Sequence, residues 1–147
     1  MVITMNNKFD ERQLLVRGKV FMFGFIYLGI FMLLNAVIRD YGILWADEPT
    51  AAVLGIMSAI CICSVMLILK DAYSAPNSNR WTVAVVIMSI SAVTSLLCGI
   101  DGWIVNGFLE NGTITIAART TLLGVFFLII SCVYWVKKYL NKREESN

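Results

Sequence analysis

Few residues of this chain could carry out covalent chemistry. The 147 residues include no histidine, and the four cysteines (Cys61, Cys63, Cys98 and Cys132) all lie inside apolar stretches. On a helix, Cys61 and Cys63 would point about 200° apart, and their spacing is not the Cys-x-x-Cys of a redox or zinc site. A site built from cysteines and histidines is therefore excluded. We interpret all four cysteines as small apolar packing residues and expect no cofactor.

Signatures of hydrolytic or phosphate chemistry are also missing from the sequence. It contains no Ser-x-x-Lys pair, no His-Glu-x-x-His motif and no Gly-rich phosphate loop. We therefore predict a protein that is not an enzyme. The enzyme alternative requires a cleft that joins Asp101, Arg119 and either Asp40 or Asp47 around a bound lipid.

The first concentration of ionisable side chains lies at the expected outer ends of the apolar stretches. We name it the outer rim, and it consists of Arg39, Asp40, Asp47, Glu48, Asp101 and Arg119. Asp101 and Arg119 end and begin neighbouring stretches, which favours an ion pair between them. The rim is either ordinary water-facing loop charge or a recognition surface for a peptide, a lipid head group or a partner protein.

The second concentration precedes the first apolar stretch. We name it the docking box, and it consists of Asp10, Glu11, Arg12, Arg17 and Lys19. These side chains could pair with Lys70, Asp71 or Arg80 of the middle loop. Two interpretations stay open: contact with lipid phosphates combined with a topology signal, or docking of a cytoplasmic regulatory protein.

Polar side chains inside the apolar stretches are few and uncharged. They are Asn35, Ser91, Thr94 and Ser95. Because lipid offers no hydrogen bonds, Asn35 should face another helix or the outer headgroup level. The Ser and Thr hydroxyls can bond the preceding turn of their own helix. Alternatively, the four residues line the polar pathway of a small transporter or channel subunit, although no stretch carries the buried carboxylate usual in ion-coupled transport.

The composition indicates which elements must position these residues. Hydrophobic residues make up 59% and charged residues 15% of the chain, and the mean hydropathy is +0.76. Such a chain has too few polar residues to cover the surface of a soluble protein. It contains four stretches of about 20 apolar residues, each long enough to cross a bilayer. We predict one all-α integral membrane domain, a four-helix transmembrane bundle with spans at 20–38, 50–69, 81–100 and 118–136.

Three flanking segments complete this prediction. Residues 1–19 are expected to form a cytoplasmic, interfacial helix, capped by Asn6 or Asn7, with Asp10 and Glu11 in its first turn. Residues 137–147 are expected to be a cytoplasmic tail. The loop 101–117 contains Asn111-Gly112 followed by the alternation Thr113–Ile116, which predicts a small extracellular hairpin with Glu110–Gly112 at its tip.

Two ridges of small residues are suited to close helix contact. One is Ala51, Gly55 and Ala59, and the other is Ser91, Ser95 and Gly99. Since a four-helix chain with two such ridges would leave one available, we expect the protein to form a homo-oligomer.

The basic residues predict the orientation in the membrane. Of the 12 Lys and Arg residues, only Arg39 and Arg119 fall on one side of the four spans, whereas the others lie in the N-terminal segment, the middle loop and the C-terminal tail. The positive-inside rule therefore places both termini in the cytoplasm of a multi-pass protein of the cell membrane. The net charge of +2 is too small to suggest binding to nucleic acid.

Several short motifs carry a family resemblance. Asp10-Glu11-Arg12-Gln13, Arg17-Gly18-Lys19, the segment Gly42–Asp47 and Lys70–Tyr73 resemble a group of small, uncharacterised four-span membrane proteins of Gram-positive bacteria. The resemblance covers roughly the first half of the chain and implies no activity. Members of that group are often encoded near small helix-turn-helix regulators, which implies a regulatory role. From the placement of the charges and the absence of buried chemistry, we expect a non-enzymatic membrane interaction protein that senses at its outer face and docks a cytoplasmic partner.

Overall fold

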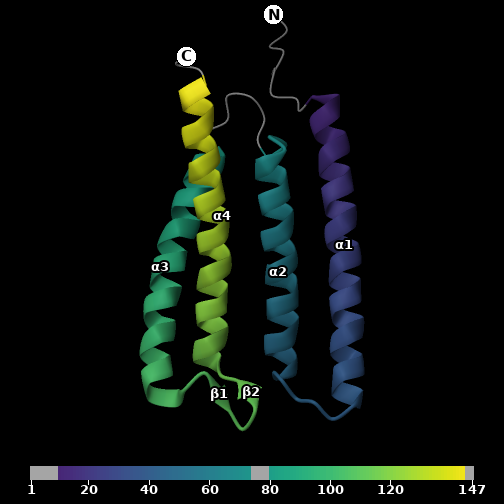
Figure 1. Ribbon diagram of the computed structural model, residues 1–147, viewed down its shortest axis with the longest axis vertical. Helices are drawn as coiled ribbons and strands as arrows, with labels where there is room; N and C mark the ends of the chain where they lie inside the picture. The colour runs from purple at the N-terminus through teal and green to yellow at the C-terminus, as the bar shows by residue number, and fades with distance from the viewer. Residues whose placement is uncertain (1–9, 74–79, 145–147) are drawn as a thin grey trace, which may run out of the picture.

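The part of the chain that the structure describes folds into four long helices. The computed structural model describes residues 10–73 and 80–144, and within them the helices are α1 (Glu11–Asp40), α2 (Glu48–Leu69), α3 (Arg80–Asn106) and α4 (Ile116–Glu144) (Figure 1). Each helix is long and apolar enough to cross a membrane. The predicted set of four apolar helices is thereby confirmed.

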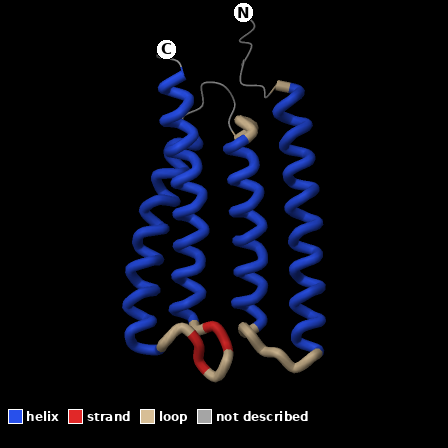
Figure 2. Tube along the Cα trace, in the orientation of Figure 1, coloured by secondary structure: helices blue, strands red, loops and turns tan. Residues whose placement is uncertain are grey.

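The helices lie side by side in the order α1, α2, α4, α3 (Figure 1). Helix α4 packs most extensively on α3 and also on α2, and α1 packs chiefly on α2. The start of α1 and the end of α4 lie at one end of the molecule, which we name the terminal face. The connections between α1 and α2 and between α3 and α4 lie at the other end, the hairpin face (Figure 2).

The helices extend beyond the predicted spans. Helix α1 runs without a break from Glu11 through the segment that we expected to be an interfacial helix. Its 30 residues correspond to about 45 Å, more than the roughly 30 Å of a bilayer's hydrocarbon core. Helix α3 continues to Asn106 and ends where Gly107 has a φ of +73°, a conformation that favours glycine. The predicted loop 101–117 therefore shortens to residues 107–115.

A small hairpin closes the connection between α3 and α4. Its strands β1 (Leu109–Glu110) and β2 (Thr113–Ile114) pair antiparallel. Both turn residues, Asn111 and Gly112, have positive φ values of 51° and 84°, as a two-residue type I′ turn requires. The hairpin prediction is confirmed in position, except that Ile116 begins α4 instead of continuing the strand.

The two small-residue ridges pack inside the chain. On α2, Gly55 faces the ring of Phe31 from α1, and a Cβ at Gly55 would collide with that ring. On α3, Gly99 packs against Thr121 of α4 in the same way. Both ridges pack against helices of their own chain. The prediction of a homo-oligomer assumed that one ridge would stay available, and neither does. Self-association stays a prediction without that support.

Two apolar clusters hold the helices together. The larger one joins α2, α3 and α4 through Cys61, Ile68, Val85, Ile130 and Tyr134. The smaller one joins Val20 of α1 to Leu67 and Ala72 at the end of α2. The buried residues of α1 are Val20 and Gly24, and most of its other apolar side chains are exposed. Exposed apolar helix surface of this extent suits lipid contact.

Candidate functional site

The docking box begins with the cap of α1. Asp10 is the N-cap residue and precedes the helix, so it does not lie in the first turn as predicted. Its backbone N–H donates to Gln13 Oε1 at 3.3 Å, which is the reciprocal contact of a capping box. Asn6 and Asn7, the predicted caps, lie outside the described residues.

The same Gln13 ties α1 to the end of α2. Its Nε2 donates to the Asp71 main-chain oxygen at 2.9 Å. The Asp71 carboxylate forms an ion pair with Lys137 of α4, with Nζ and Oδ2 3.0 Å apart. Asp71 also has a positive φ of 52°. The start of α1 therefore contacts the middle loop through neutral Gln13, a residue that the predicted pairing of the docking box with Lys70, Asp71 or Arg80 did not include.

Aromatic rings extend this junction toward α3 and α4. Tyr73 meets Trp81 and Tyr134 edge to face, with ring centroids 5.7 Å apart in both pairs. The Tyr134 hydroxyl lies 2.7 Å from Thr82 Oγ1. Burial raises the pKa of Tyr73, and the nearby Tyr134 and Asp71 raise it further. The sequence interpretation missed the contact between Tyr73 and Tyr134, because it depends on the packing of α4 beside α2.

Helical phase divides the first turns of α1 into two faces. Gln13 and Val20 face α2, and Arg17, half-buried, lies between them on the same side. Glu11, Arg12 and Lys19 are exposed. Arg12 and Lys19 are seven residues apart, which puts them on one side of a helix. Leu15 lies between them and is 68% exposed.

An apolar groove of about 390 Å³ lies between α1 and α2 on the terminal-face side of the molecule. From α1 it is lined by Arg17, Phe21, Gly24, Phe25 and Leu28; from α2 by Ile56, Ala59, Ile60, Cys63, Ser64 and Leu67; and from α3 by Trp81. The sequence interpretation missed this groove. Its signal was the spacing of Arg17, Phe21, Gly24 and Leu28 by four, three and four residues, which marks one helix face.

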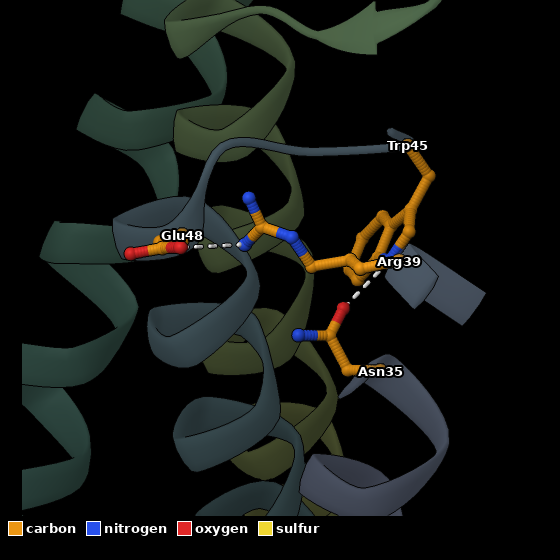
Figure 3. Close-up of polar contacts among 4 residues, drawn as sticks. All are labelled: Asn35, Arg39, Trp45 and Glu48. Atoms are coloured by element: carbon orange, nitrogen blue, oxygen red, sulfur yellow. Dashed lines mark hydrogen bonds and ion pairs between the residues drawn. The ribbon is translucent and has the colours of Figure 1, made fainter. Parts of the chain in front are cut away.

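At the hairpin face, one polar contact joins the ends of α1 and α2, and another ties the connection between them to α1. Arg39 Nη1 and Glu48 Oε1 are 3.4 Å apart, and Trp45 Nε1 donates to Asn35 Oδ1 at 2.8 Å (Figure 3). Asn35 thus bonds the indole of a loop residue at this end of the molecule, and not a side chain of another helix. The Trp45 main-chain oxygen also accepts a hydrogen bond from the Ile114 N–H of the hairpin at 2.9 Å.

The predicted Asp101–Arg119 ion pair is not formed. Asp101 is exposed on α3 because that helix continues past it, and Arg119 instead donates from Nη1 to Thr50 Oγ1 at 3.3 Å. Asp40 and Asp47 are exposed. Asp47 lines a surface hollow together with Glu110, Thr113 and Thr115, and neither Asp101 nor Arg119 lines it. The cleft required by the enzyme alternative is therefore not assembled there.

The intramembrane polar residues are not brought together. Asn35 belongs to α1 and the other three to α3, and these helices lie at opposite ends of the row (Figure 1). Thr94 Oγ1 bonds within its own helix, to the main-chain oxygens of Ile90 and Ser91 at 3.1 Å each. Ser91 and Ser95 are half-buried on α3. These residues do not form a common lining for a polar pathway.

Comparisons with known proteins add no relative to this description. No family model matches the chain, and no curated protein or solved structure matches it either. The resemblance to small Gram-positive membrane proteins therefore stays a prediction.

Proposed function

We propose that this chain is a non-enzymatic interaction protein of the cell membrane, with both termini in the cytoplasm. The observation that carries the proposal is an exposed stripe on the first turns of α1. It consists of Glu11, Arg12, Leu15 and Lys19, which we name the docking stripe. It points away from α2 because Gln13, Val20 and Gly24 on the opposite face are used for packing.

The stripe combines features of a surface that recognises a protein. Two cationic side chains flank the exposed leucine, and the carboxylate of Glu11 lies one position before Arg12. An apolar side chain framed by charges suits a protein partner, since the leucine supplies buried area and the charges supply specificity. Arg17, a member of the docking box, does not belong to the docking stripe, because it lines the α1–α2 groove. The proposed docking surface is thus narrower than the docking box.

The surrounding structure supports a fixed platform for such docking. Gln13 bonds the end of α2, and Asp71 links that end to α4. A partner bound to the stripe would therefore meet a helix start whose position relative to α2 and α4 is set by polar contacts. The second half of the proposal is sensing at the outer rim and the hairpin. A signal from there would reach the docking stripe through α1.

Photo-cross-linking in cells tests the docking proposal. A photoreactive amino acid at Leu15 should trap a discrete protein partner, and the same amino acid at exposed Ile30, further along α1, should not. The double variant Arg12→Glu/Lys19→Glu should abolish the adduct by reversing the charge of the stripe. Enough basic residues remain on the terminal face to preserve orientation.

Lys142→Glu is the matched control, because Lys142 is exposed in the last turn of α4, the helix that ends at the same face. An adduct that survives the double variant, or that Lys142→Glu abolishes equally, would contradict docking through the stripe.

A further inference from the structure

We infer that the α1–α2 groove binds one acyl chain of an anionic phospholipid, with the lipid phosphate held by Arg17. This goes beyond the proposed function, because Arg17 lies on the side of α1 opposite the docking stripe. The inference depends on the length of the groove, on the distribution of polarity along it, and on the charge at its end.

The groove has the length of one membrane leaflet. Arg17 and Leu28 are 11 residues apart on α1, and Ile56 and Leu67 are equally far apart on α2. Eleven residues of helix correspond to about 16 Å. One leaflet contributes half of a hydrocarbon core of roughly 30 Å, or about 15 Å. An acyl chain that begins beside Arg17 would therefore end near the middle of the bilayer, at Leu28 and Ile56.

Polarity changes along the groove as it does along a lipid molecule. The end near the terminal face has Arg17, Ser64 and the indole of Trp81, whereas Phe25, Leu28 and Ile56 are further inside. Tryptophan is enriched at the level of lipid head groups. The first part of the groove thus matches a head group and glycerol, and the remainder matches hydrocarbon.

Arg17 supplies the charge that selects an anionic head group. Its guanidinium carries five N–H donors in a planar fork that suits phosphate. Arg17 also makes a contact within the protein, and five donors allow it to keep that contact while it binds a phosphate. Under the proposed orientation the groove opens to the cytoplasmic leaflet, where anionic lipids attract basic segments.

Gly24 allows α1 and α2 to touch directly beside the groove. A Cβ at this position would collide with Cys63 Sγ, whose thiol contacts the Val20 main-chain oxygen at 3.6 Å. Helices α1 and α2 therefore touch at Gly24 and Cys63, and the groove runs beside that contact. An acyl chain can occupy it without separation of the two helices.

Native mass spectrometry of the full chain in detergent tests the inference, with phosphatidylglycerol and phosphatidylcholine as probes. We expect one phosphatidylglycerol adduct that forms at lower lipid concentration than the phosphatidylcholine adduct. Arg17→Gln should weaken phosphatidylglycerol binding about tenfold, as for the loss of a charge-assisted hydrogen bond. Arg17→Lys should retain part of the binding. Arg12→Gln, the matched control on the exposed face of α1, should bind as the unaltered chain does.

A second pair of variants tests the groove independently of Arg17. Ile60→Trp should fill the groove and weaken the binding of both lipids, whereas Ile30→Trp, on an exposed part of α1 outside the groove, should not. Equal losses in Arg17→Gln and Arg12→Gln, or unchanged binding in Ile60→Trp, would overturn the inference. Displacement of the lipid by inorganic phosphate would also overturn it, as would a dimer of the chain that Ile60→Trp dissociates.

Discussion

Asp71 connects three helices through one backbone position. Its main-chain oxygen accepts from Gln13 of α1, its carboxylate pairs with Lys137 of α4, and it lies two residues beyond the end of α2 with a φ of 52°. L-residues rarely adopt this left-handed conformation, and Asn, Asp and Gly tolerate it best. Two effects therefore determine what residue 71 contributes: the cost of the backbone conformation and the attraction of the ion pair.

Substitutions at Asp71 separate these two effects. Asp71→Asn keeps the tolerance of left-handed backbone and loses a partly exposed ion pair, so we expect a loss of about 0–1 kcal/mol. Asp71→Ala should lose a further 1–2 kcal/mol or so, because Cβ disfavours this conformation without a polar side chain to offset it. The midpoint of unfolding by SDS in mixed micelles measures both changes.

Lys137→Gln is the control for the Asp71 series, since it removes the same ion pair from the other side. Its loss of stability should match that of Asp71→Asn. A loss in Asp71→Asn as large as that in Asp71→Ala would mean that charge, and not backbone conformation, dominates at this position.

At the scale of elements, the closest glycine contact of the described residues lies between α3 and α4, at Gly99. A Cβ at Gly99 would overlap Thr121 Oγ1 and approach the Thr121 backbone nitrogen to 3.0 Å. Because a backbone atom cannot rotate away as a side chain can, Gly99→Ala must push the helices apart. We expect a loss of about 1–3 kcal/mol, typical of overpacking, again measured by SDS unfolding.

Gly29→Ala is the matched control for the α3–α4 contact. Gly29 also lies within an apolar helix, but a Cβ there meets nothing within 4 Å. This variant should be neutral or should gain up to about 1 kcal/mol from helix propensity. Thr121→Ala should restore part of the stability lost in Gly99→Ala, because it removes the overlapping hydroxyl. Equal losses in the two glycine variants would contradict control by close packing.

The elements differ in how far the sequence could predict them. The four helices follow from hydropathy, because a helix in lipid must satisfy its own backbone hydrogen bonds. The hairpin follows from Asn111-Gly112, whose positive φ values few other pairs allow. The order α1, α2, α4, α3 cannot be predicted from the sequence, since a ridge of small residues indicates a contact face but not which helix packs against it. The Asp101–Arg119 pair failed for a related reason: the two residues end up on helix faces that do not meet.

The sequence could not predict which helix faces meet at the candidate site either. The docking box was identified by charge, but charge does not distinguish Arg17, which lines the groove, from Arg12, which is exposed. That distinction comes from the phase of α1 against α2, which Gly24 and Cys63 determine by direct contact. The spacing of Arg17, Phe21, Gly24 and Leu28 marks one face of α1, but it does not show that this face borders a groove, because α2 and α3 supply the rest of the lining.

At the scale of the whole molecule, orientation decides how both proposals work. The start of α1 and the end of α4 lie at one face and the hairpin at the other (Figures 1 and 2), and the excess of Lys and Arg on the terminal face favours a cytoplasmic location for it. In intact cells, a membrane-impermeant thiol reagent should label Asn111→Cys at the hairpin tip, and it should label Lys142→Cys only after permeabilisation. The native cysteines lie within the apolar helices, so the unaltered chain measures the background. The opposite labelling pattern would place the docking stripe outside the cell, and it would move the groove from the anionic cytoplasmic leaflet to the outer one.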